Sequence, residues 1–236
     1  MSRRRWIADE VNGDRAALTG AHAAHLVRVL RARVGQEFDI ATGGPVRRGT
    51  VSLISSNEDR VEFDLGETVE ASESAEITLL LSIFKFDRVE WAIEKCTELG
   101  VARIVPVIAR RTEVHLAKAA EKRVERWRRI AVQASEQSRR SAVPIIDDPV
   151  KLSRELLSQF STTKIILSEM ETNAKLRELL DSDQSDSTAL AIGPEGGWTP
   201  EELQMFAECG WLSASLGSTI LRAETAAIAA LAIVAH

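Results

Sequence analysis

The sequence predicts an α/β protein built from two parts: a small β-barrel or half-barrel, then a parallel sheet with helices on both faces. Residues 1–70 contain short segments with alternating apolar positions between Gly-rich corners, which is typical of strands joined by turns. From residue 77 onward, continuous apolar strand segments alternate with helical segments, as in a parallel sheet buried on both faces. The 236 residues suffice for one large domain or two of uneven size.

The first part is predicted to contain strands and one short helix. The strands are expected at residues 3–8, 36–44, 47–56 and 59–68. The helix is expected at 22–33, where apolar residues recur on one face and Gly35 follows as a stop. The acidic, Ser-containing segment 68–76 has the composition of a linker. The sequence therefore divides into a domain at 1–70 and a domain at 77–236.

The second part is predicted to repeat strand and helix. Strands are expected at residues 77–84, 101–109, 143–146, 163–168, 189–193 and 211–217. Helices are expected at residues 87–100, 116–137, 150–160, 174–180, 200–209 and 223–234. In an open parallel sheet, ligands bind beyond the carboxyl ends of the strands. We therefore expect a binding site in the loops that follow these strands.

Composition favours a cytoplasmic protein with reduced thiols. No apolar run reaches the roughly 18–20 residues of a membrane helix, and no apolar stretch follows the basic start MSRRRWIADE. Cys96 and Cys209 lie in helical patterns among apolar neighbours, without the spacing of a zinc site or a redox pair, so we expect both to be buried. The histidines form no ligand spacing either, and we expect no metal.

Charge is distributed unevenly along the chain. The net charge is -5, yet residues 102–140 contain eleven Lys or Arg against four Glu, while residues 57–76 contain eight acids against one arginine. Phosphate binding responds to the local field more than to the total charge, so the basic segments fit a nucleic-acid partner. Solvated helix faces are the alternative. Trp127 in the basic helix could stack on a base, although burial in the core is favoured.

The segment IGPEGGWTPEEL, residues 192–203, follows a predicted strand. Its second half is explained by a helix start, with Thr199 as N-cap, Pro200 at the first position and Glu202 completing a capping box. The three glycines and Glu195 are not needed for a cap. Glycines at this place let backbone groups approach a ligand without obstruction by Cβ atoms, which favours a binding role. The spacing matches neither a P-loop nor a dinucleotide-binding fingerprint.

The segment LGSTILRAETAAIAAL, residues 216–231, has the same form of strand end, glycine, polar turn and helix. The helix is nearly all small and apolar, so it is expected to be buried on several sides, against another subunit if one is present. Arg222 lies at the edge of this apolar region and needs a partner. Glu224 or Glu195 could provide it, in a structural ion pair or around a substrate.

Taken together, these segments resemble the ribosomal RNA small subunit methyltransferase E family of the SPOUT superfamily. EKCTELGVARIVPV and ASEQSRRSAVPII add to the two segments above, and HLVRVLRARVGQEF matches the family's opening, so the resemblance covers most of the chain. It implies S-adenosylmethionine-dependent methylation of N3 of uridine 1498 in 16S rRNA of the 30S subunit. It further implies an N-terminal PUA-like barrel, a trefoil-knotted SPOUT domain and a homodimer.

The resemblance also implies the site residues. By motif, S-adenosylmethionine is bound by Leu167, Ser168, Glu169, Ile192, Gly193, Gly196, Leu216, Ser218, Ile220 and Leu221. The side chains of Leu216 and Leu221 would enclose the adenine ring. Uracil N3 must lose a proton, so Glu195 or Glu224 is expected to act as base and Arg222 to stabilise the developing negative charge.

RNA is expected to contact basic residues of both parts. The candidates are Arg3, Arg4, Arg5, Arg28, Arg31, Lys85, Arg111 and Arg140, with ordinary surface charge as the alternative for each. Two other functions remain open. A SPOUT enzyme could act on another RNA or on a ribose 2′-hydroxyl, and a non-catalytic RNA-binding or assembly factor could keep the fold without the chemistry.

Overall fold

The computed structural model describes residues 5–55, 59–70, 76–181 and 187–235. The chain divides into two units. The N-terminal unit consists of Met1–Glu73 with Ser135–Val143, and the parallel-sheet unit consists of Ser74–Ala134 with Pro144–His236. Residues 135–143 thus belong to the N-terminal unit, and the first three of them are the last residues of a long helix, Val124–Gln137, that begins in the other unit. The segment 71–75, in the expected linker, lies outside the described residues.

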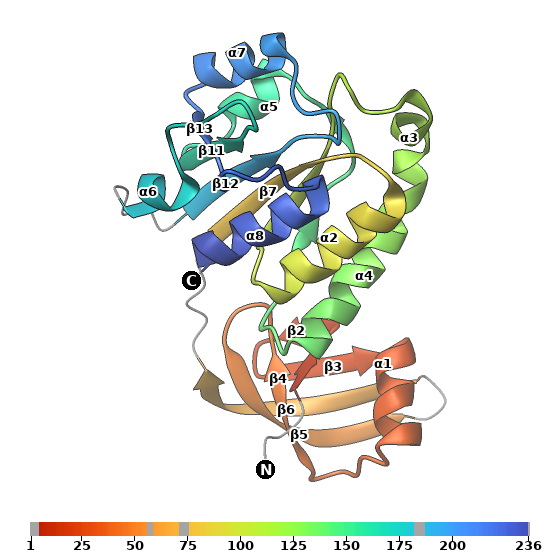
Figure 1. Ribbon diagram of the computed structural model, residues 1–236. Helices are drawn as coiled ribbons and strands as arrows, with labels where there is room; N and C mark the ends of the chain where they lie inside the picture. The colour runs from red at the N-terminus through yellow and green to blue at the C-terminus, as the bar shows by residue number, and fades with distance from the viewer. Residues whose placement is uncertain (1–4, 56–58, 71–75, 182–186, 236) are drawn as a thin grey trace. The chain divides into compact units, whose positions relative to one another are not determined.

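Among the described residues, the N-terminal unit contains a six-stranded sheet in the order β1-β4-β5-β6-β3-β2 (Figure 1). Its strands are β1 (Arg5–Ile7), β2 (Glu10–Asn12), β3 (Arg15–Thr19), β4 (Glu37–Ala41), β5 (Val46–Ser55) and β6 (Arg60–Glu70). Strands β1 and β4 run parallel, and the other neighbours are antiparallel. The alternating side chains of one sheet face form the core, with Leu18, Phe38 and Phe63 at its centre.

The helix of this unit differs from the expected one. α1 covers Gly20–Ala24 and continues as a π-helix at His25–Val29, so it ends four residues before Arg33. A residue in the left-handed conformation often ends a helix. Gly35 is expected in this role and has φ 86°, but Arg31, which is nearer to the helix end, is also left-handed, with φ 53°. Arginine has a Cβ and gains nothing from this conformation, so the π-helix and its exit must be held by packing against the core.

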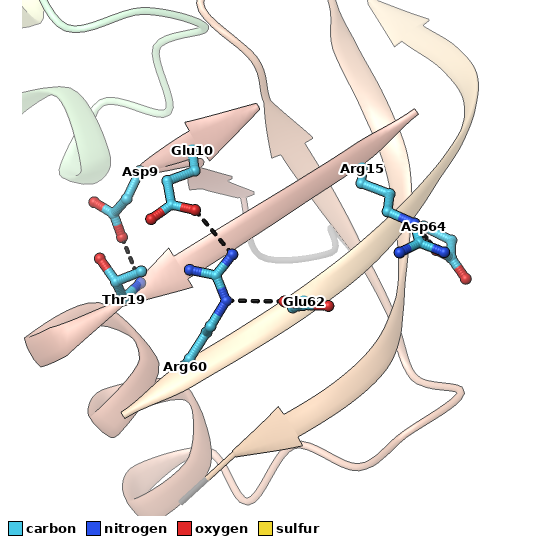
Figure 2. A network of polar contacts seen from close by, with 7 residues as sticks. All are labelled: Asp9, Glu10, Arg15, Thr19, Arg60, Glu62 and Asp64. Carbon is cyan, nitrogen blue, oxygen red and sulfur yellow. Dashed lines mark hydrogen bonds and ion pairs between the residues drawn. The ribbon is translucent and has the colours of Figure 1, made fainter. Parts of the chain in front are cut away.

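Ion pairs occupy the surface formed by β2, β3 and β6. The Arg60 guanidinium donates to Glu10 and Glu62 at 2.8 and 2.9 Å, and Arg15 lies 3.8 Å from Asp64 (Figure 2). Arg15 and Asp64 face each other on the paired strands β3 and β6, where opposite charges support the register. Arg60 and Glu62 lie two residues apart on β6, and Glu10 lies on β2, beyond β3. Within the acidic stretch, Asp59, Glu62 and Asp64 therefore have arginine partners.

A second polar contact in the N-terminal unit involves His22, whose ring lies between two carboxylates. Its Nδ1 is 3.0 Å from Asp9 Oδ1, and its Nε2 is 3.1 Å from Glu136 Oε1. The hydrogen bond to Asp9, together with the charges of both carboxylates, raises the pKa of His22 above its ordinary 6.5, although burial opposes the shift.

Replacing His22 with Gln is expected to destabilise the protein more near pH 6 than near pH 9. A histidine with a raised folded pKa stabilises fully below its unfolded pKa of 6.5, and this contribution disappears as the pH rises through the folded pKa. We expect about 0.5–1 kcal/mol for this partly exposed pair. Urea titrations at both pH values give the free energies of unfolding, with the exposed His115→Gln as control. An equal loss at both pH values would contradict this assignment.

The parallel-sheet unit contains strands in the order β10-β8-β7-β12-β11-β13, with β9 pairing to β8, and all are parallel (Figure 1). The strands are β7 (Glu76–Ser82), β8 (Arg103–Ile108), β9 (Ile145–Ile146), β10 (Val150–Lys151), β11 (Thr163–Leu167), β12 (Ser187–Ile192) and β13 (Leu212–Ala214). Their central residues are almost fully buried, as the continuous apolar runs predict. The predicted α/β class with a parallel sheet is confirmed.

Helices cover the two faces of this sheet. They are α2 (Phe86–Glu98), α3 (Val114–Ala119), α4 (Val124–Gln137), α5 (Arg154–Ser158), α6 (Leu176–Asp181), α7 (Pro200–Glu208) and α8 (Ala223–Ala235). α2 and α8 lie side by side over one face of the sheet (Figure 1). α5 and α7 cover the other face, where Leu157 and Phe206 pack against Val107 and Ala189.

Three expectations for this unit, two helices and the burial of one cysteine, are corrected. The helix expected at 116–137 is broken, because a 3₁₀ turn at Ala120–Arg123 separates α3 from α4. The helix expected from residue 150 begins at Arg154, after Ser153 caps it and β10 takes the preceding residues. Cys209 is only half-buried, whereas Cys96 is buried and its burial raises the thiol pKa to about 12.

Trp127 and Trp198 are buried in the core of this unit. Trp127 is fully buried, which confirms its expected place in the core. Trp198 packs edge-on against Phe206, with ring centroids 4.9 Å apart. No helix among the described residues is long and apolar enough to span a membrane.

Candidate active site

A pocket of about 660 Å³ lies at the carboxyl ends of β11, β12 and β13 and reaches the first turns of α2 and α8. This is the edge where ligands of open parallel sheets bind. The residues predicted to bind a cofactor that line it are Leu167, Ser168, Glu169, Ile192, Gly193, Leu216, Ser218, Ile220 and Leu221. Among the described residues, no group of three or more His, Cys, Asp or Glu could hold a metal ion.

The glycine turn after β12 is shaped by close packing on both sides. A Cβ at Gly193 would lie 3.2 Å from the Trp198 ring, and Trp198 Nε1 donates to Leu167 O at 3.1 Å. Gly197 has φ +70° and donates its N–H to Pro194 O at 2.8 Å, which closes the turn. Glycine is therefore required at position 193 by the nearby Trp198 ring and at position 197 by the left-handed backbone.

Gly196 is placed differently from the other predicted cofactor residues. It does not line the pocket, and a Cβ there would face the Arg111 side chain at 3.4 Å. The Arg111 guanidinium donates to Gly196 O at 2.5 Å. This arginine, which we expected at the RNA surface, therefore supports the outer side of the glycine turn.

The capping box predicted at the start of α7 is confirmed. The Thr199 hydroxyl accepts from Glu202 N at 3.3 Å, and Glu202 Oε2 accepts from Thr199 N at 2.8 Å. Glu202 is buried, and its other oxygen accepts from Arg110 N at 2.8 Å. Both oxygens of this buried carboxylate are thus satisfied, as burial of a charge requires.

The carboxylates expected near Arg222 are paired with a different arginine. Arg88, in the first turn of α2, donates from Nη1 to Glu195 Oε1 at 2.6 Å, and its Nε is 3.7 Å from Glu224 Oε1. Glu195 and Arg88 line the pocket, whereas Glu224 does not and is buried. The sequence does not single out Arg88, because an arginine in an amphipathic helix is normally a surface charge.

Arg222 lines the pocket and is exposed. Among the residues that the structure describes, none forms a hydrogen bond or ion pair with its guanidinium. A cation without a protein partner at a pocket rim is free to meet a negatively charged ligand group. This placement is compatible with the predicted stabilisation of charge on a substrate.

The predicted RNA-binding residues are dispersed. Arg3 and Arg4 lie outside the described residues. In the N-terminal unit, Arg28 donates to Asp59 at 2.9 Å and Arg31 is exposed. Arg5 donates to the carbonyl oxygen of Arg139, and burial lowers the pKa of Arg140. Lys85 is exposed at the start of α2 in the other unit.

Further lining residues lie in the loop after β11. Met170, Glu171, Thr172 and Lys175 belong to this group, and Met170 is 76% exposed. The predicted cofactor residues of this loop end at Glu169. The rule that loops after parallel strands form the site could have extended the prediction to them.

The chain matches the family model described as an RNA methyltransferase domain over residues 71–235. It is 32% identical to the ribosomal RNA small subunit methyltransferase E of Synechocystis, over 91% of this chain and 71% of that protein. It is 30% identical to the Bacillus subtilis protein of the same name, over 93% and 89% of the two chains. The protein of that name from Aquifex aeolicus is 30% identical over 97% of both chains.

Solved structures of methyltransferases also match nearly the whole chain. The methyltransferase E of Neisseria gonorrhoeae, bound to S-adenosyl methionine, superposes with a TM-score of 0.80 at 32% identity, over 98% of this chain and 96% of that chain. A Legionella pneumophila methyltransferase in complex with the same cofactor gives 0.80 at 29% identity, over 99% and 97%. With the pocket geometry, these matches show that the chain belongs to the ribosomal RNA small subunit methyltransferase E family.

Proposed function

We propose that the protein is an S-adenosylmethionine-dependent methyltransferase that methylates N3 of uridine 1498 in 16S rRNA of the small ribosomal subunit. The observation that carries this proposal is the pocket, which brings the glycine turn and the segment 216–222 together. Relatives bearing the methyltransferase name align over most of the chain, and two related structures contain the cofactor. Such an enzyme would work in the cytoplasm, where ribosomes are assembled.

The pocket suits this cofactor in size and chemistry. A volume of about 660 Å³ is in the range of small-molecule sites. Leu216 and Leu221 supply apolar surface for adenine, while the backbone beside Gly193 and Leu167 offers hydrogen-bonding groups. When bound, S-adenosylmethionine supplies an electrophilic methyl group on its sulfonium. The residues Arg222, Glu195 and Glu224 are proposed to act on the uracil that receives it, because two of them line the pocket and the third lies directly behind Arg88.

For the architecture we propose a PUA-like barrel at 1–70 and a knotted SPOUT domain at 77–236. The mixed six-stranded sheet, in which β5 and β6 are curved (Figure 1), supports the first. The strand order supports the second, because β11 lies between β12 and β13, which follow it in the chain, and the loops after all three meet in one pocket. Knots are rare in proteins. Refolding of the fully unfolded chain through a slow step, in which one segment threads through a loop, would support this proposal.

We also propose that the protein acts as a homodimer through α8. This helix is almost entirely apolar, and Ile228, Ala229, Ile233 and Val234 remain only partly buried on it. The neighbouring helix α2 adds Trp91, which is 48% exposed. Apolar surface of this kind commonly becomes buried in a subunit interface.

For RNA, we propose that the exposed basic residues of both units contact the substrate. Arg31 and Lys85 are exposed, and Arg28 has one surface ion pair that phosphate could replace at little cost. Arg5, Arg111 and Arg140 make contacts within the protein and would approach RNA with their remaining donors. Arg3 and Arg4 are proposed from the sequence alone.

The proposed activity is tested with 30S subunits from a strain that lacks the modification. Incubation with tritiated S-adenosylmethionine should label one uridine of 16S rRNA, and nucleoside analysis should identify 3-methyluridine. Label on a ribose hydroxyl or on another RNA would instead show a different SPOUT methyltransferase. No label together with no calorimetric cofactor binding would show a non-catalytic RNA-binding factor.

A further inference from the structure

We propose that Arg88, Glu195 and Arg222 form a row that recognises the base-pairing edge of uracil, and that Glu224 is the positioning residue behind Arg88. We call the first three residues the edge triad. The inference rests on the proposed function, because it assigns roles toward the uridine that is to be methylated. It adds a residue that neither the motifs nor the family resemblance indicates.

The edge triad is assembled from three separate parts of the chain. Arg88 comes from the first turn of α2, Glu195 from the glycine turn after β12, and Arg222 from the residue before α8. All three line the same pocket, and the 2.6 Å hydrogen bond from Arg88 Nη1 fixes one oxygen of Glu195. The second oxygen, Glu195 Oε2, accepts no hydrogen bond from a described residue and remains available to a ligand.

Glu224 explains why Arg88 keeps one orientation. Its side chain is only 4% exposed, and Oε1 lies 3.7 Å from Arg88 Nε. Its Oε2 has no hydrogen-bond partner among the described residues. A buried carboxylate needs a nearby cation, so Glu224 holds the Nε side of the guanidinium. The planar guanidinium then turns Nη1 to Glu195 and leaves Nη2 without a partner among the described residues.

The edge triad presents a cation, a carboxylate and a cation to the pocket. Uracil presents the complementary pattern on its base-pairing edge, with acceptors at O4 and O2 on either side of the N3–H donor. Enzymes that act on a base read this edge by hydrogen bonds. Cytosine would place the N3 lone pair against the Glu195 carboxylate, and an unmatched pair of acceptors is costly in a desolvated site. The edge triad therefore selects uracil.

The same contact accounts for the proton that uracil must lose. As N3 is methylated, the N3–H bond breaks and its proton passes to Glu195 Oε2. The electron pair left on N3 forms the bond to the methyl carbon, whose bond to the sulfonium sulfur breaks. Negative charge that develops on O2 and O4 is stabilised by Arg88 and Arg222. Among the two carboxylates, Glu195 thus accepts the proton and Glu224 orients Arg88.

The test compares two 30S preparations, with uridine or cytidine at position 1498, in equilibrium binding with S-adenosylhomocysteine so that no turnover occurs. We expect wild-type protein to prefer uridine by roughly tenfold or more, in line with hydrogen-bond readout of a base edge. In Glu195→Gln this preference should disappear, to a ratio of about one. The amide N–H of glutamine then faces the N3–H of uracil, and two donors cannot form a hydrogen bond. Cofactor affinity, measured by calorimetry, should remain within about twofold.

Two further variants separate positioning from folding. Glu224→Gln keeps the shape of the side chain but removes its charge, and it should lower both the uridine preference and kcat while KM for the cofactor is unchanged. Arg88→Lys should retain part of the preference that Arg88→Met loses. The control is Glu178→Gln, which removes an exposed carboxylate of α6 outside the pocket and should leave the base preference unchanged.

The inference is overturned if Glu195→Gln keeps the wild-type preference, or if Arg88→Met loses cofactor binding and leaves the base preference intact. The first result would remove Glu195 from base recognition, and the second would assign Arg88 to the cofactor. A failure of the proposed function is distinguishable, because wild-type protein would then leave the uridine preparation unlabelled in the assay with tritiated S-adenosylmethionine and would bind both preparations equally.

Discussion

Arg222→Ala is expected to lower kcat for methylation of 30S subunits by about 100-fold, while affinity for S-adenosylmethionine changes little. Arg222 lines the pocket, is exposed and has no partner among the described residues, so its removal breaks no ion pair of the fold. Loss of one donor that stabilises developing negative charge typically costs 10²–10³-fold in turnover, and that is the basis of the estimate.

Kinetics and mass measurements together test the role of Arg222. Single-turnover methylation gives the rate of the chemical step, and light scattering shows whether the mass of the proposed dimer is retained. Arg222→Lys keeps the charge but not the two-pronged geometry, and it should be intermediate. Arg177→Ala, an exposed arginine of α6 outside the pocket, is the matched control and should be fully active. An Arg222→Ala protein that aggregates or becomes monomeric would reveal a structural role.

Gly193→Ala is expected to weaken S-adenosylmethionine binding by about tenfold or more and to reduce the free energy of unfolding by about 1–3 kcal/mol, a typical cost of overpacking. Its Cβ would lie 3.2 Å from two atoms of the Trp198 ring. Either the indole moves and its hydrogen bond to Leu167 O lengthens, or the glycine turn shifts. Gly193 and Leu167 both line the pocket, so either response deforms it.

Calorimetry of cofactor binding checks this expectation. Gly44→Ala is a matched control, because a Cβ there meets nothing within 4 Å and the backbone is not left-handed. The double variant Gly193→Ala, Trp198→Phe removes the atoms of the clash and should recover part of the lost affinity. Undiminished binding by the single variant would show that the pocket tolerates movement of Trp198.

The glycine turn and the segment 216–222 could be predicted because their sequences are unusual. A capped helix does not need three glycines, so the additional glycines indicate a binding role for the turn, part of which lines the pocket. Arg88 could not be predicted in this way. It occupies an ordinary position in DRVEWAIEKCTELG, and only the fold places it between Glu195 and Glu224. Local patterns report local geometry, whereas a contact across about 100 residues depends on how the strands are ordered.

The same distinction explains the errors in the secondary structure. β2 has three exposed residues, so no alternation of apolar positions marks it as a strand. The interruption between α3 and α4 contains only Ala120, Glu121, Lys122 and Arg123, which are good helix formers, so tertiary packing must impose the 3₁₀ turn. The strands β7, β8, β11 and β12 were predictable because strands that are buried on both faces consist of nearly continuous apolar residues.

Glu202 has a consequence for the thermodynamics of cofactor binding. Its buried carboxylate ties the N–H groups of Thr199 and Arg110 together, and Arg111 holds Gly196 O from outside. The backbone that forms one wall of the pocket is therefore ordered before any cofactor arrives. A preorganised wall loses little conformational entropy on binding, so more of the interaction energy remains as affinity. A carboxylate that does not line the pocket is thus expected to influence how tightly the cofactor is held.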